Sequence, residues 1–575
     1  MTTNTDAIGP QGGGRTFLGH PRGLVTLFFT EMWERFSYYG MRALLVLYLT
    51  QHFLFSDDAA QGLYGAYAAL VYLMPVLGGF IADRFLGPRK AVTIGAVLLV
   101  MGHFGMAFEG RGSTQLLETA AGVYEIEAQG RGEGRSLFLL EGERRLPISF
   151  SSEGVTIEGA ATAPAFVPQG AYTLTARSDT IDIGGAQLPA EYVLYLSLAL
   201  IIAGVGFLKA NISTSVGLLY PEGDPRRDAG FTIFYMGINL GSLMATLACG
   251  YLGQRYGWAY GFGLAGIGMT LGLIQYLMGQ KHLQGVTDPP RPLSQTIEGL
   301  FWIGGLLAVI PLWFLIREYA LMEQVLTFGV PAIFFGMFLY AWVGFKDVER
   351  GRMLAALVLM VFSVIFWMLF EQAGSSLTLF AERNTDLTIV GSVRMTAAQT
   401  QFFNPFFIVA LAAPLSLLWQ WLAKRRQEPS TPVKFSLGLI QVGVGFLILV
   451  FGAQFAGPDY RTPVIWLALA YLLHTLGELF LSPVGLSMTT KLSAARVIGL
   501  MMGVWFLSSS LAHILAAKIA QLTSQETVAG QVLDPAAQLV SYTMVFTRIG
   551  WAGVGAGVLL LLLTPWLKRA MHGVK

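Results

Sequence analysis

The sequence predicts an all-α integral membrane protein with about fourteen spanning helices and one small β-rich insertion outside the membrane. Of its 575 residues, 54% are hydrophobic and 13% are charged, whereas soluble proteins carry about 25% charged residues. Apolar runs near twenty residues recur along the chain, and about that length crosses a bilayer core of roughly 30 Å. One stretch of about eighty residues instead alternates apolar and polar residues, which is typical of short strands.

The apolar runs give the expected spans in order. Short polar breaks such as RFLGPRK, PEGDPRRD and KDVERGR separate them, and several runs exceed a perpendicular span, which allows tilted helices. The expected spans lie near residues 24–50, 60–82, 91–108, 192–219, 229–254, 258–279, 299–317, 321–345, 353–380, 398–422, 435–455, 463–490, 497–521 and 540–567.

The positive charges of the loops predict the orientation. Lys and Arg gather in every second loop, as in Lys424, Arg425 and Arg426, while the short loops between them hold few, namely Arg317, Arg383, Arg394 and Arg461. The positive-inside rule therefore places both termini in the cytoplasm. The first apolar run is long enough to be a retained span, so we expect no cleaved leader.

Several function classes find no support in the sequence. The net charge of +2 gives no sign of nucleic-acid binding. The single cysteine, Cys249, excludes an internal disulfide, and His103, His474 and His513 each stand alone and are interpreted as packed or hydrogen-bonded side chains. We therefore expect neither a metal nor a cofactor. GFGLAG at 261–266 is interpreted as close helix packing, and the absence of a G-x-x-x-x-G-K-[ST] motif leaves ATP-driven pumping unsupported.

Residues 109–190 do not fit the pattern of spans. The segments VYEIEAQ, VTIEG and YTLTARSDTIDIG alternate apolar and polar residues, and Gly, Pro and Ser punctuate them. The segment predicts a β-rich domain outside the cytoplasm, where long loops are exempt from the charge rule. It serves either as a spacer or stabilising cap, or as a site for substrate or a protein partner, and the sequence leaves both open.

The first apolar run contains a polar stripe, in EMWERFSYYGMR at 31–42. At about 100° per residue, Glu31, Glu34, Arg35, Tyr38 and Arg42 fall on one helix face. A charged side chain at the bilayer centre costs about 2.5–3.5 kcal/mol, so such charges pair or line a polar cavity. The alternatives are an ion-pair knot that locks helix packing and a position at the membrane surface. The stripe favours a polar pathway through a helix bundle.

Three further charges interrupt other spans. Lys209 stands in LIIAGVGFLKANIST, Glu371 in IFWMLFEQAGSSL and Glu478 in YLLHTLGELFLSPVG. A buried glutamate has a raised proton affinity, which a nearby lysine or arginine lowers again. Ion pairs that form and break between these helices would therefore take up and release protons, which predicts proton coupling without a cofactor.

These motifs resemble a known family. EMWERFSYY at 31–39 matches the E-x-x-E-R-F-x-Y-Y signature of the proton-coupled oligopeptide transporters of the major facilitator superfamily. FYMGINLGSL at 234–243 and GGFIADRFLGPRK at 78–90 resemble two further motifs, and GFLKANIS, FWMLFEQ, QFFNPFFI and GELFLSPVGLSM resemble the family's helices four, seven, eight and ten. The resemblance implies the superfamily fold, with two six-helix bundles and an inserted helix pair.

The resemblance also implies a division of the chain. The parts are helices one to three of the first bundle in 1–108, the β-rich insertion in 109–190, helices four to six in 191–280, the extra helix pair in 281–350, and helices seven to twelve in 351–575.

The resemblance assigns roles to named positions. The residues implied in proton coupling are Glu31, Glu34, Arg35, Lys209 and Glu371. The residues implied in substrate binding are Tyr39, Arg42, Tyr72, Lys209, Asn239, Trp367, Asn404, Glu478, Ser482 and Trp505. Arg42 and Glu371 resemble the pair whose bridge closes one side of the cavity, and Glu478 resembles the residue that receives the peptide amino terminus.

The implied function is proton-coupled import of di- and tripeptides by alternating access, in the bacterial inner membrane. A short peptide is a zwitterion, and two or three extended residues place its termini about 7–10 Å apart. Arg42 and Lys209 on one wall and Glu478 on the other would bind those termini and tolerate many side chains. The alternatives are a peptide receptor that uses the external domain and a nitrate-like anion symporter. No enzyme activity is expected.

The chain departs from the family pattern in three places, the first of which is the insertion at 109–190, because it is not part of the common fold. Ala210 follows Lys209 where the family usually has proline, so the local bend of that helix is in doubt. The second span has Tyr64, Tyr67 and Tyr72 but no histidine, so proton handling by a histidine there, as in animal relatives, is not available.

Overall fold

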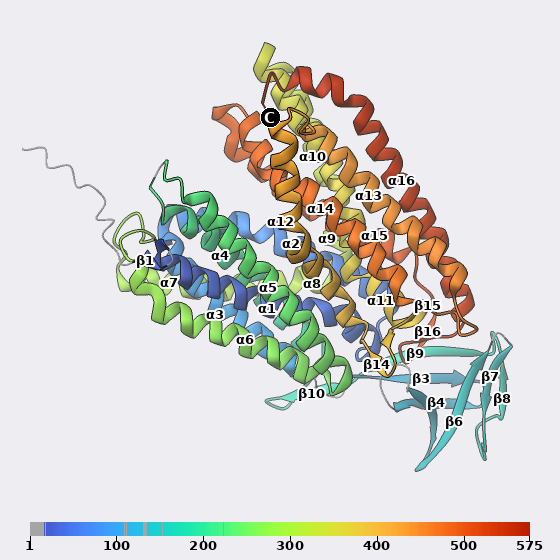
Figure 1. Cartoon of the computed structure of the whole chain (residues 1–575). Helices are drawn as coiled ribbons and strands as arrows, with labels where there is room; N and C mark the ends of the chain where they lie inside the picture. The colour runs from blue at the N-terminus through green and yellow to red at the C-terminus, as the bar shows by residue number, and fades with distance from the viewer. Residues whose placement is uncertain are drawn as a thin grey trace, which may run out of the picture.

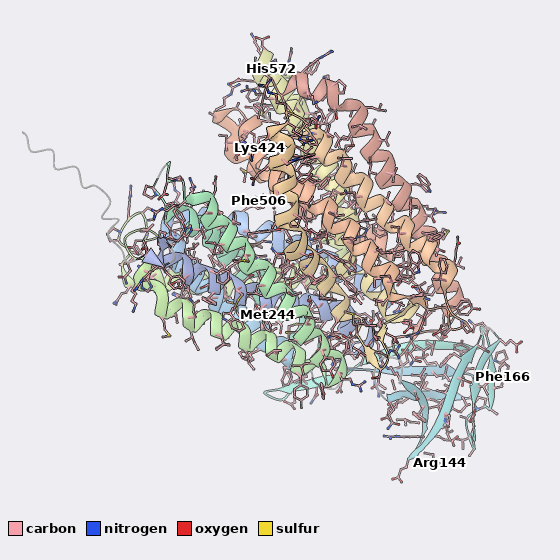
Figure 2. All side chains as sticks on the ribbon, in the orientation of Figure 1. Arg144, Phe166, Met244, Lys424, Phe506 and His572 are labelled. Carbon is pink, nitrogen blue, oxygen red and sulfur yellow. The ribbon has the colours of Figure 1, made fainter. Side chains whose placement is uncertain are left out.

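The computed structural model describes residues 16–17, 19–108, 110, 112–129, 135–151, 153–221 and 223–574, except the side chains of residues 183 and 482–487. The helices form two groups that converge at the end that carries a β-sheet and diverge at the other end (Figure 1). Figure 2 shows Arg144 and Phe166 at the far edge of the sheet, and Lys424 and His572 at the opposite end of the molecule.

The first bundle consists of six long helices. They are α1 (Arg22–Gln51), α2 (Asp57–Ile81), α3 (Gly87–Ala107), α4 (Glu191–Leu218), α5 (Arg227–Arg255) and α6 (Trp258–Gly279). A π-helical turn, Ala82–Leu86, joins α2 to α3 directly. The inserted pair follows as α7 (Gln295–Leu307) with α8 (Val309–Arg317), and α9 (Tyr319–Gly344).

The second bundle begins with a broken helix. The sequence predicts one span over 353–380, but the structure has α10 (Asp347–Phe370), a 3-10 turn η4 (Glu371–Gly374) and α11 (Ser376–Asn384). The break therefore begins at one of the predicted buried charges. The remaining helices are α12 (Phe403–Lys424), α13 (Thr431–Gly452), α14 (Val464–Leu492), α15 (Ile498–Gln521) and α16 (Pro535–Ala570).

The helices account for the predicted spans. Length and apolarity alone identify 12 segments, one of which, Asp57–Ala107, contains both α2 and α3. The helix α1 is not among them, because its polar stripe adds charges to every apolar window. Counting α2 and α3 separately and adding α1 gives fourteen spans in the described part of the chain. The prediction of a multi-pass all-α membrane protein is confirmed.

Glycines let several helices approach closely. A Cβ on Gly95 of α3 would lie 2.6 Å from the carbonyl oxygen of Gly204 on α4, and a Cβ on Gly204 would lie 2.8 Å from that of Gly95. In lipid, no hydrophobic effect drives helices together, so their association depends on close van der Waals packing, which small residues allow. Gly261 packs in the same way, because a Cβ there would lie 2.5 Å from Leu44. This contact agrees with the helix-packing interpretation of GFGLAG.

The insertion is a seven-stranded antiparallel sheet, in the order β8-β7-β6-β5-β4-β3-β9. Its strands are β3 (Ser113–Thr119), β4 (Gly122–Gln129), β5 (Ser136–Glu141), β6 (Arg144–Ser151), β7 (Gly154–Ile157), β8 (Phe166–Pro168) and β9 (Tyr172–Ser178). A separate hairpin, β10 (Thr180–Ile183) and β11 (Ala186–Pro189), leads into α4. The prediction of a β-rich insertion is confirmed.

The sheet contacts both bundles at the same end. Its apolar core includes Val528 and Ala529, which belong to the loop between α15 and α16. The backbone N–H of Ala529 also donates to the side chain of Gln115 on β3, at 3.1 Å. On the side of the first bundle, the N–H of Ser113 donates to the carbonyl oxygen of His52, at 2.9 Å. The insertion therefore bridges the two bundles where they converge.

Candidate functional site

The polar stripe of α1 is buried and incompletely paired. Glu31 is 2% exposed, Glu34 is 0% exposed and Arg35 is 5% exposed. Arg35 Nε donates to Glu31 Oε1 at 2.8 Å and lies 2.7 Å from Glu34 Oε2. Within the described part of the chain, neither oxygen of Glu34 accepts a hydrogen bond. One guanidinium thus faces two carboxylates, and a bare second carboxylate is costly to bury. The cluster suits a group that carries a proton.

Lys209 of α4 stands beside this cluster. Its side chain is half-buried, its ammonium nitrogen lies 3.7 Å from the centre of the Tyr72 ring, and it is within electrostatic range of Glu31 and Glu34. Among the described residues it has no carboxylate within ion-pair distance. The structure therefore presents Lys209 as a cation held over an aromatic face, with its charge available to a ligand.

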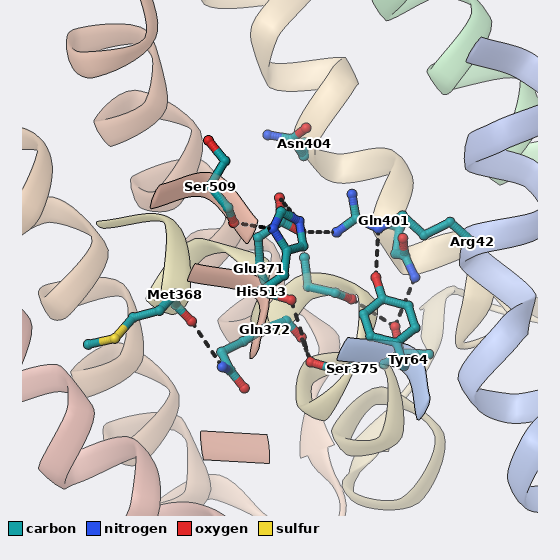
Figure 3. A network of polar contacts seen from close by, with 12 residues as sticks. Arg42, Tyr64, Met368, Glu371, Gln372, Ser375, Gln401, Asn404, Ser509 and His513 are labelled. Carbon is teal, nitrogen blue, oxygen red and sulfur yellow. Dashed lines mark hydrogen bonds and ion pairs between the residues drawn. The ribbon is translucent and has the colours of Figure 1, made fainter. Parts of the chain in front are cut away.

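Arg42 and Glu371 form an ion pair between the bundles, as the resemblance implied. Arg42 Nη2 donates to Glu371 Oε2, and Arg42 Nε donates to the hydroxyl of Tyr64 at 2.7 Å (Figure 3). The backbone of η4 approaches this group so closely that a Cβ on Gly374 would lie 1.8 Å from the Tyr64 hydroxyl. Glycine is therefore required at this position for the pair to form.

A second set of contacts between the bundles was not found from the sequence. Arg383 of α11 donates to both oxygens of Asp57 at the start of α2, at 2.6 and 2.7 Å. Glu382 accepts from Gln51 at 3.1 Å and from Gln254 at 2.9 Å. These residues lie at the end that carries the sheet. Between 128 and 331 positions separate the partners along the chain, so no spacing in the sequence pointed to them.

The opposite end shows a different pattern. There, none of the ion pairs described by the structure joins the first bundle to the second, as Arg89–Asp288, Lys90–Glu298 and Arg496–Glu349 illustrate. The bundles are fastened at the sheet-bearing end, where Arg42–Glu371 and Asp57–Arg383 join them. The molecule is thus held in a state closed at that end.

The predicted acidic wall lies in the second bundle. Asn404 of α12 donates to Glu478 Oε2 at 2.8 Å and to the hydroxyl of Thr475 at 3.1 Å, both on α14. Asn404 and Glu478 are half-buried. The amide orients the carboxylate and leaves its other oxygen without a described hydrogen bond. Asn404 and Glu478 are therefore brought together, across the interface from Arg42 and Lys209.

Of the remaining residues predicted to bind substrate, some lie in the charged cluster and others do not. Tyr39 is half-buried and lies under the Arg42 guanidinium, which is 5.8 Å from its ring centre. Asn239 donates to Tyr235 of its own helix at 3.0 Å. Trp367 contacts Phe366 and Phe370 on its own helix, and Trp505 is half-buried on α15. Ser482 lies outside the described side chains. The structure thus places Tyr39 in the cluster but shows no contact between Asn239 or Trp367 and the charged groups.

His513 was missed as a member of the site. The residue stands alone in the sequence, but its Nε2 lies 3.6 Å from Glu371 Oε1, and its ring lies against Tyr72 with 4.5 Å between centres. Figure 3 shows it beside Glu371, opposite Arg42. The residue is 142 positions from Glu371 along the chain, so only the fold reveals the contact. His474, in contrast, packs against Phe446, as expected.

Comparisons with known proteins show what this chain is similar to. The family model described as the POT family matches residues 89–536. The uncharacterized transporter YclF of Bacillus subtilis is 34% identical over 97% of this chain and 96% of its own length. A di-/tripeptide transporter of Lactococcus lactis is 32% identical over 98% of both chains. The crystal structure of a peptide transporter in complex with alafosfalin superposes with a TM-score of 0.72 and 32% identity, over 97% of this chain and 98% of its own.

Proposed function

Because this chain belongs to the POT family of transporters, we propose that it imports di- and tripeptides together with protons by alternating access. One observation carries the proposal: cationic groups of the first bundle face an acidic group of the second. Lys209 is available to a peptide carboxylate, and Arg42, paired with Glu371 in this state, adds positive charge to the same bundle. Glu478, oriented by Asn404, is available to a peptide ammonium. Charges in these positions bind the two termini of a peptide and do not discriminate between its side chains. This arrangement supports transport of many different di- and tripeptides.

In this proposal, the coupling proton binds to the carboxylate of Glu34. Its carboxylate is buried, shares Arg35 with Glu31 and lies in electrostatic range of Lys209. When a peptide carboxylate draws Lys209 away, Glu34 loses a stabilising cation, and a proton compensates for it. Peptide binding and proton binding at neighbouring groups then favour each other, which is the coupling that a symporter requires.

We assign the sheet-bearing end to the outside of a bacterial inner membrane and both termini to the cytoplasm. The basic loops support this orientation, since Lys424 lies at the end opposite the sheet (Figure 2). The ion pairs Arg42–Glu371 and Asp57–Arg383 then close the external side, and the described state is the one that releases cargo inward. No cofactor other than the coupling proton enters this scheme.

The alternatives have less support. A receptor would not need exchangeable buried charges, yet Glu34, Lys209 and Glu478 are all present. An anion symporter would not need a carboxylate in its pocket, yet Asn404 holds Glu478 there. The resemblance to transporters over nearly the whole chain also favours transport.

Uptake into proteoliposomes tests the proposal. Purified protein should accumulate a radiolabelled dipeptide against its gradient only when protons are driven inward. Each charge moved through 100 mV supplies about 2.3 kcal/mol, or roughly 50-fold accumulation. A protonophore should abolish the accumulation. Binding without uptake, or accumulation that ignores the proton gradient, would overturn the proposal.

A matched variant separates coupling from binding. Glu34→Gln keeps the shape of the side chain and cannot release a proton. We expect it to exchange external for internal dipeptide at a rate near that of the wild type, while gradient-driven accumulation falls to the equilibrated level. Retained accumulation in this variant would exclude Glu34 as the coupling group.

A further inference from the structure

An apolar groove lies between the first bundle, the inserted helix pair and the hairpin β10–β11. Its walls come from the end of α3, the start of α4, the junction of α7 with α8, and the hairpin. The groove has a volume of about 480 Å³, and every residue that lines it is apolar or aromatic. The lining includes Met101, Ile181, Leu188, Leu196, Leu306 and Ile310. Its volume falls in the range of small-molecule sites, about 300–1,000 Å³.

The break between α7 and α8 lies in one wall of this groove. α7 ends at Leu307 and α8 begins at Val309. Pro311 lies in the first turn of α8, where its missing N–H costs no helical hydrogen bond, whereas one continuous helix would lose a bond there. Leu306 and Ile310 flank the break and line the groove. The sequence of the inserted pair therefore shapes this wall.

The position of the groove determines what fills it. Its lining belongs largely to membrane-spanning helices, near the end that carries the sheet. Water does not hydrate an apolar groove of this kind, and an empty groove loses dispersion contacts along its walls. A hydrocarbon chain restores those contacts. Because lipid surrounds these helices, an acyl chain is the occupant that the groove fits.

The mouth of the groove carries a basic and aromatic cluster. The guanidinium of Arg317, at the end of α8, lies 5.5 Å from the ring centre of Tyr192 and 5.6 Å from that of Trp313. The indole N–H of Trp313 donates to the carbonyl oxygen of Tyr192 at 3.3 Å, which joins α8 to α4. Aromatic rings gather where a membrane meets water. The cluster therefore marks the level of the lipid headgroups.

Two carboxylates stand beside this arginine. Glu318 Oε1 lies 3.6 Å from Arg317 Nε, and the two side chains are 48% and 43% exposed, so their mutual attraction is weak. Glu191 begins α4, and both Glu191 and Arg317 lie within electrostatic range of Tyr195. Among the described residues, no cation lies within ion-pair distance of Glu191. The mouth thus offers one cation to a phosphate and two carboxylates to an ammonium.

We propose that this groove binds one phosphatidylethanolamine molecule from the leaflet on the sheet-bearing side. An acyl chain fills the groove, Arg317 binds the phosphate, and Glu191 and Glu318 bind the primary ammonium. A phosphatidylglycerol headgroup would bring no cation to the two carboxylates, and a choline ammonium has no N–H to donate. The lipid contacts the first bundle, the inserted pair and the hairpin together. This inference does not depend on what the protein transports.

Lipid binding to the purified full chain tests the acyl-chain part of the site. Phosphatidylethanolamine, phosphatidylcholine and phosphatidylglycerol with identical acyl chains are added in equal amounts, and native mass spectrometry counts the lipids bound. Leu306→Trp fills the groove from α7, and Leu196→Trp fills it from α4. Leu307→Trp is the matched control, because Leu307 is the next residue, is 56% exposed and does not line the groove.

Charge variants test the headgroup part of the site. Arg317→Gln should weaken all three lipids alike, because each carries the phosphate. Glu191→Gln combined with Glu318→Gln should remove the preference for phosphatidylethanolamine and leave the other two lipids unchanged or stronger. Arg177→Gln, at a 61% exposed side chain in β9, controls for the loss of an arginine elsewhere. Excess inorganic phosphate should not displace the lipid, because it lacks the chain.

We expect the wild type to hold one phosphatidylethanolamine, with about threefold less of either other lipid, a preference of the size that exposed charge pairs support. Leu306→Trp and Leu196→Trp should each lower binding of all three lipids about tenfold, the effect of excluding about two methylene groups. Leu307→Trp and Arg177→Gln should bind as the wild type does. Equal thermal stability of the variants shows that a fold defect is not the cause.

Several outcomes would overturn the proposal. Wild-type binding that ignores the headgroup would exclude the assignment of Arg317, Glu191 and Glu318. Unchanged binding in both groove-filling variants, or equal loss in Leu307→Trp, would exclude the groove as the site. A dimer that Leu306→Trp disrupts and Leu307→Trp preserves would show that a second copy of the chain covers the groove instead. If one groove-filling variant fails to fold, the other one, on the opposite wall, decides.

Discussion

Neutralising Asp57 should open the transporter at the end that carries the sheet. Asp57 is joined to Arg383 by two hydrogen bonds of 2.6 and 2.7 Å, and the two side chains are 3% and 7% exposed. In Asp57→Asn the guanidinium stays buried without an anion as long as the bundles remain closed. Opening brings Arg383 into water and relieves that penalty, so the variant favours the open state.

The size of the effect follows from the pair. Removing one partner of a buried ion pair costs about 3–5 kcal/mol, and each charge-assisted hydrogen bond contributes about 1.5–3 kcal/mol. When the pair separates in the wild type, both charged groups regain hydration, which offsets part of the cost of opening. We therefore take about 1.5 kcal/mol, the lower end of the range for one charge-assisted hydrogen bond. A shift of about 1.5 kcal/mol toward the open state increases its population about tenfold.

Reaction of a buried thiol from outside measures this population. Gln61 lies one turn along α2 from Asp57 and is fully buried. A Gln61→Cys reporter, in a Cys249→Ala background, should react with a membrane-impermeant maleimide about ten times faster when Asp57→Asn is added. Val390→Cys, at a site that is 73% exposed in the external hairpin, corrects for reagent access.

Two further variants decide whether the ion pair is the cause. Arg383→Gln alone should raise the rate, because it leaves a buried carboxylate. The double variant Asp57→Asn with Arg383→Gln carries no unpaired charge and should react more slowly than either single variant. If the wild type and both single variants react at equal rates, the Asp57–Arg383 ion pair does not hold the bundles closed. If the effects of the two substitutions add in the double variant, the two residues do not act as a pair.

Two other predictions follow from the same geometry. Glu478→Gln should weaken binding of a free dipeptide by about 1.5–3 kcal/mol, the worth of a charge-assisted hydrogen bond, and competition assays should show no such loss for the N-acetylated peptide. In the insertion, hydrogen bonds from the Thr162 side chain and from the backbone N–H groups of Ala163 and Thr162 lower the pKa of Glu141 from 4.5 to about 2. The lowered value means that Glu141 stabilises the insertion above about pH 4.5 and that this contribution is lost as the pH falls toward 2. Pepsin cleavage within the insertion should therefore rise over that range in the wild type, and Glu141→Gln should remove the pH dependence that this carboxylate adds.

The spans were predictable because each depends on local information. An apolar run of twenty residues must be a helix in lipid, whatever its neighbours are. The insertion was predictable for a similar reason, since alternation over a few residues identifies a strand. The break at Glu371–Gly374 was not, because the segment FEQAGSS contains no proline and only one glycine, so nothing local marks the end of a helix there. It exists because Gly374 must let the backbone reach Tyr64 and Arg42.

The site was predictable only where a motif or a misplaced charge marked it. Glu31, Glu34, Arg35, Lys209, Glu371 and Glu478 all interrupt apolar runs, and the structure places them in or beside the charged clusters. Asp57 and Arg383 stand near span ends, where charges are common, so their pairing carried no signal. His513 carried none either, because a lone histidine on an apolar helix is usually a packed one. The fold supplies its partner from η4.

The insertion adds a cost to opening that the ion pairs do not include. It is covalently attached to α3 and α4, so it moves with the first bundle, yet its apolar core contains Val528 and Ala529 of the second. Opening the sheet-bearing end must therefore withdraw these side chains from the sheet and break the hydrogen bond from Ala529 to Gln115. Re-exposing one valine costs about 1.5–3 kcal/mol, similar to the contribution assigned to Asp57–Arg383. The sheet thus favours the state closed at its own end by an amount comparable to one gate ion pair, and proton and peptide binding together must supply the free energy to break both.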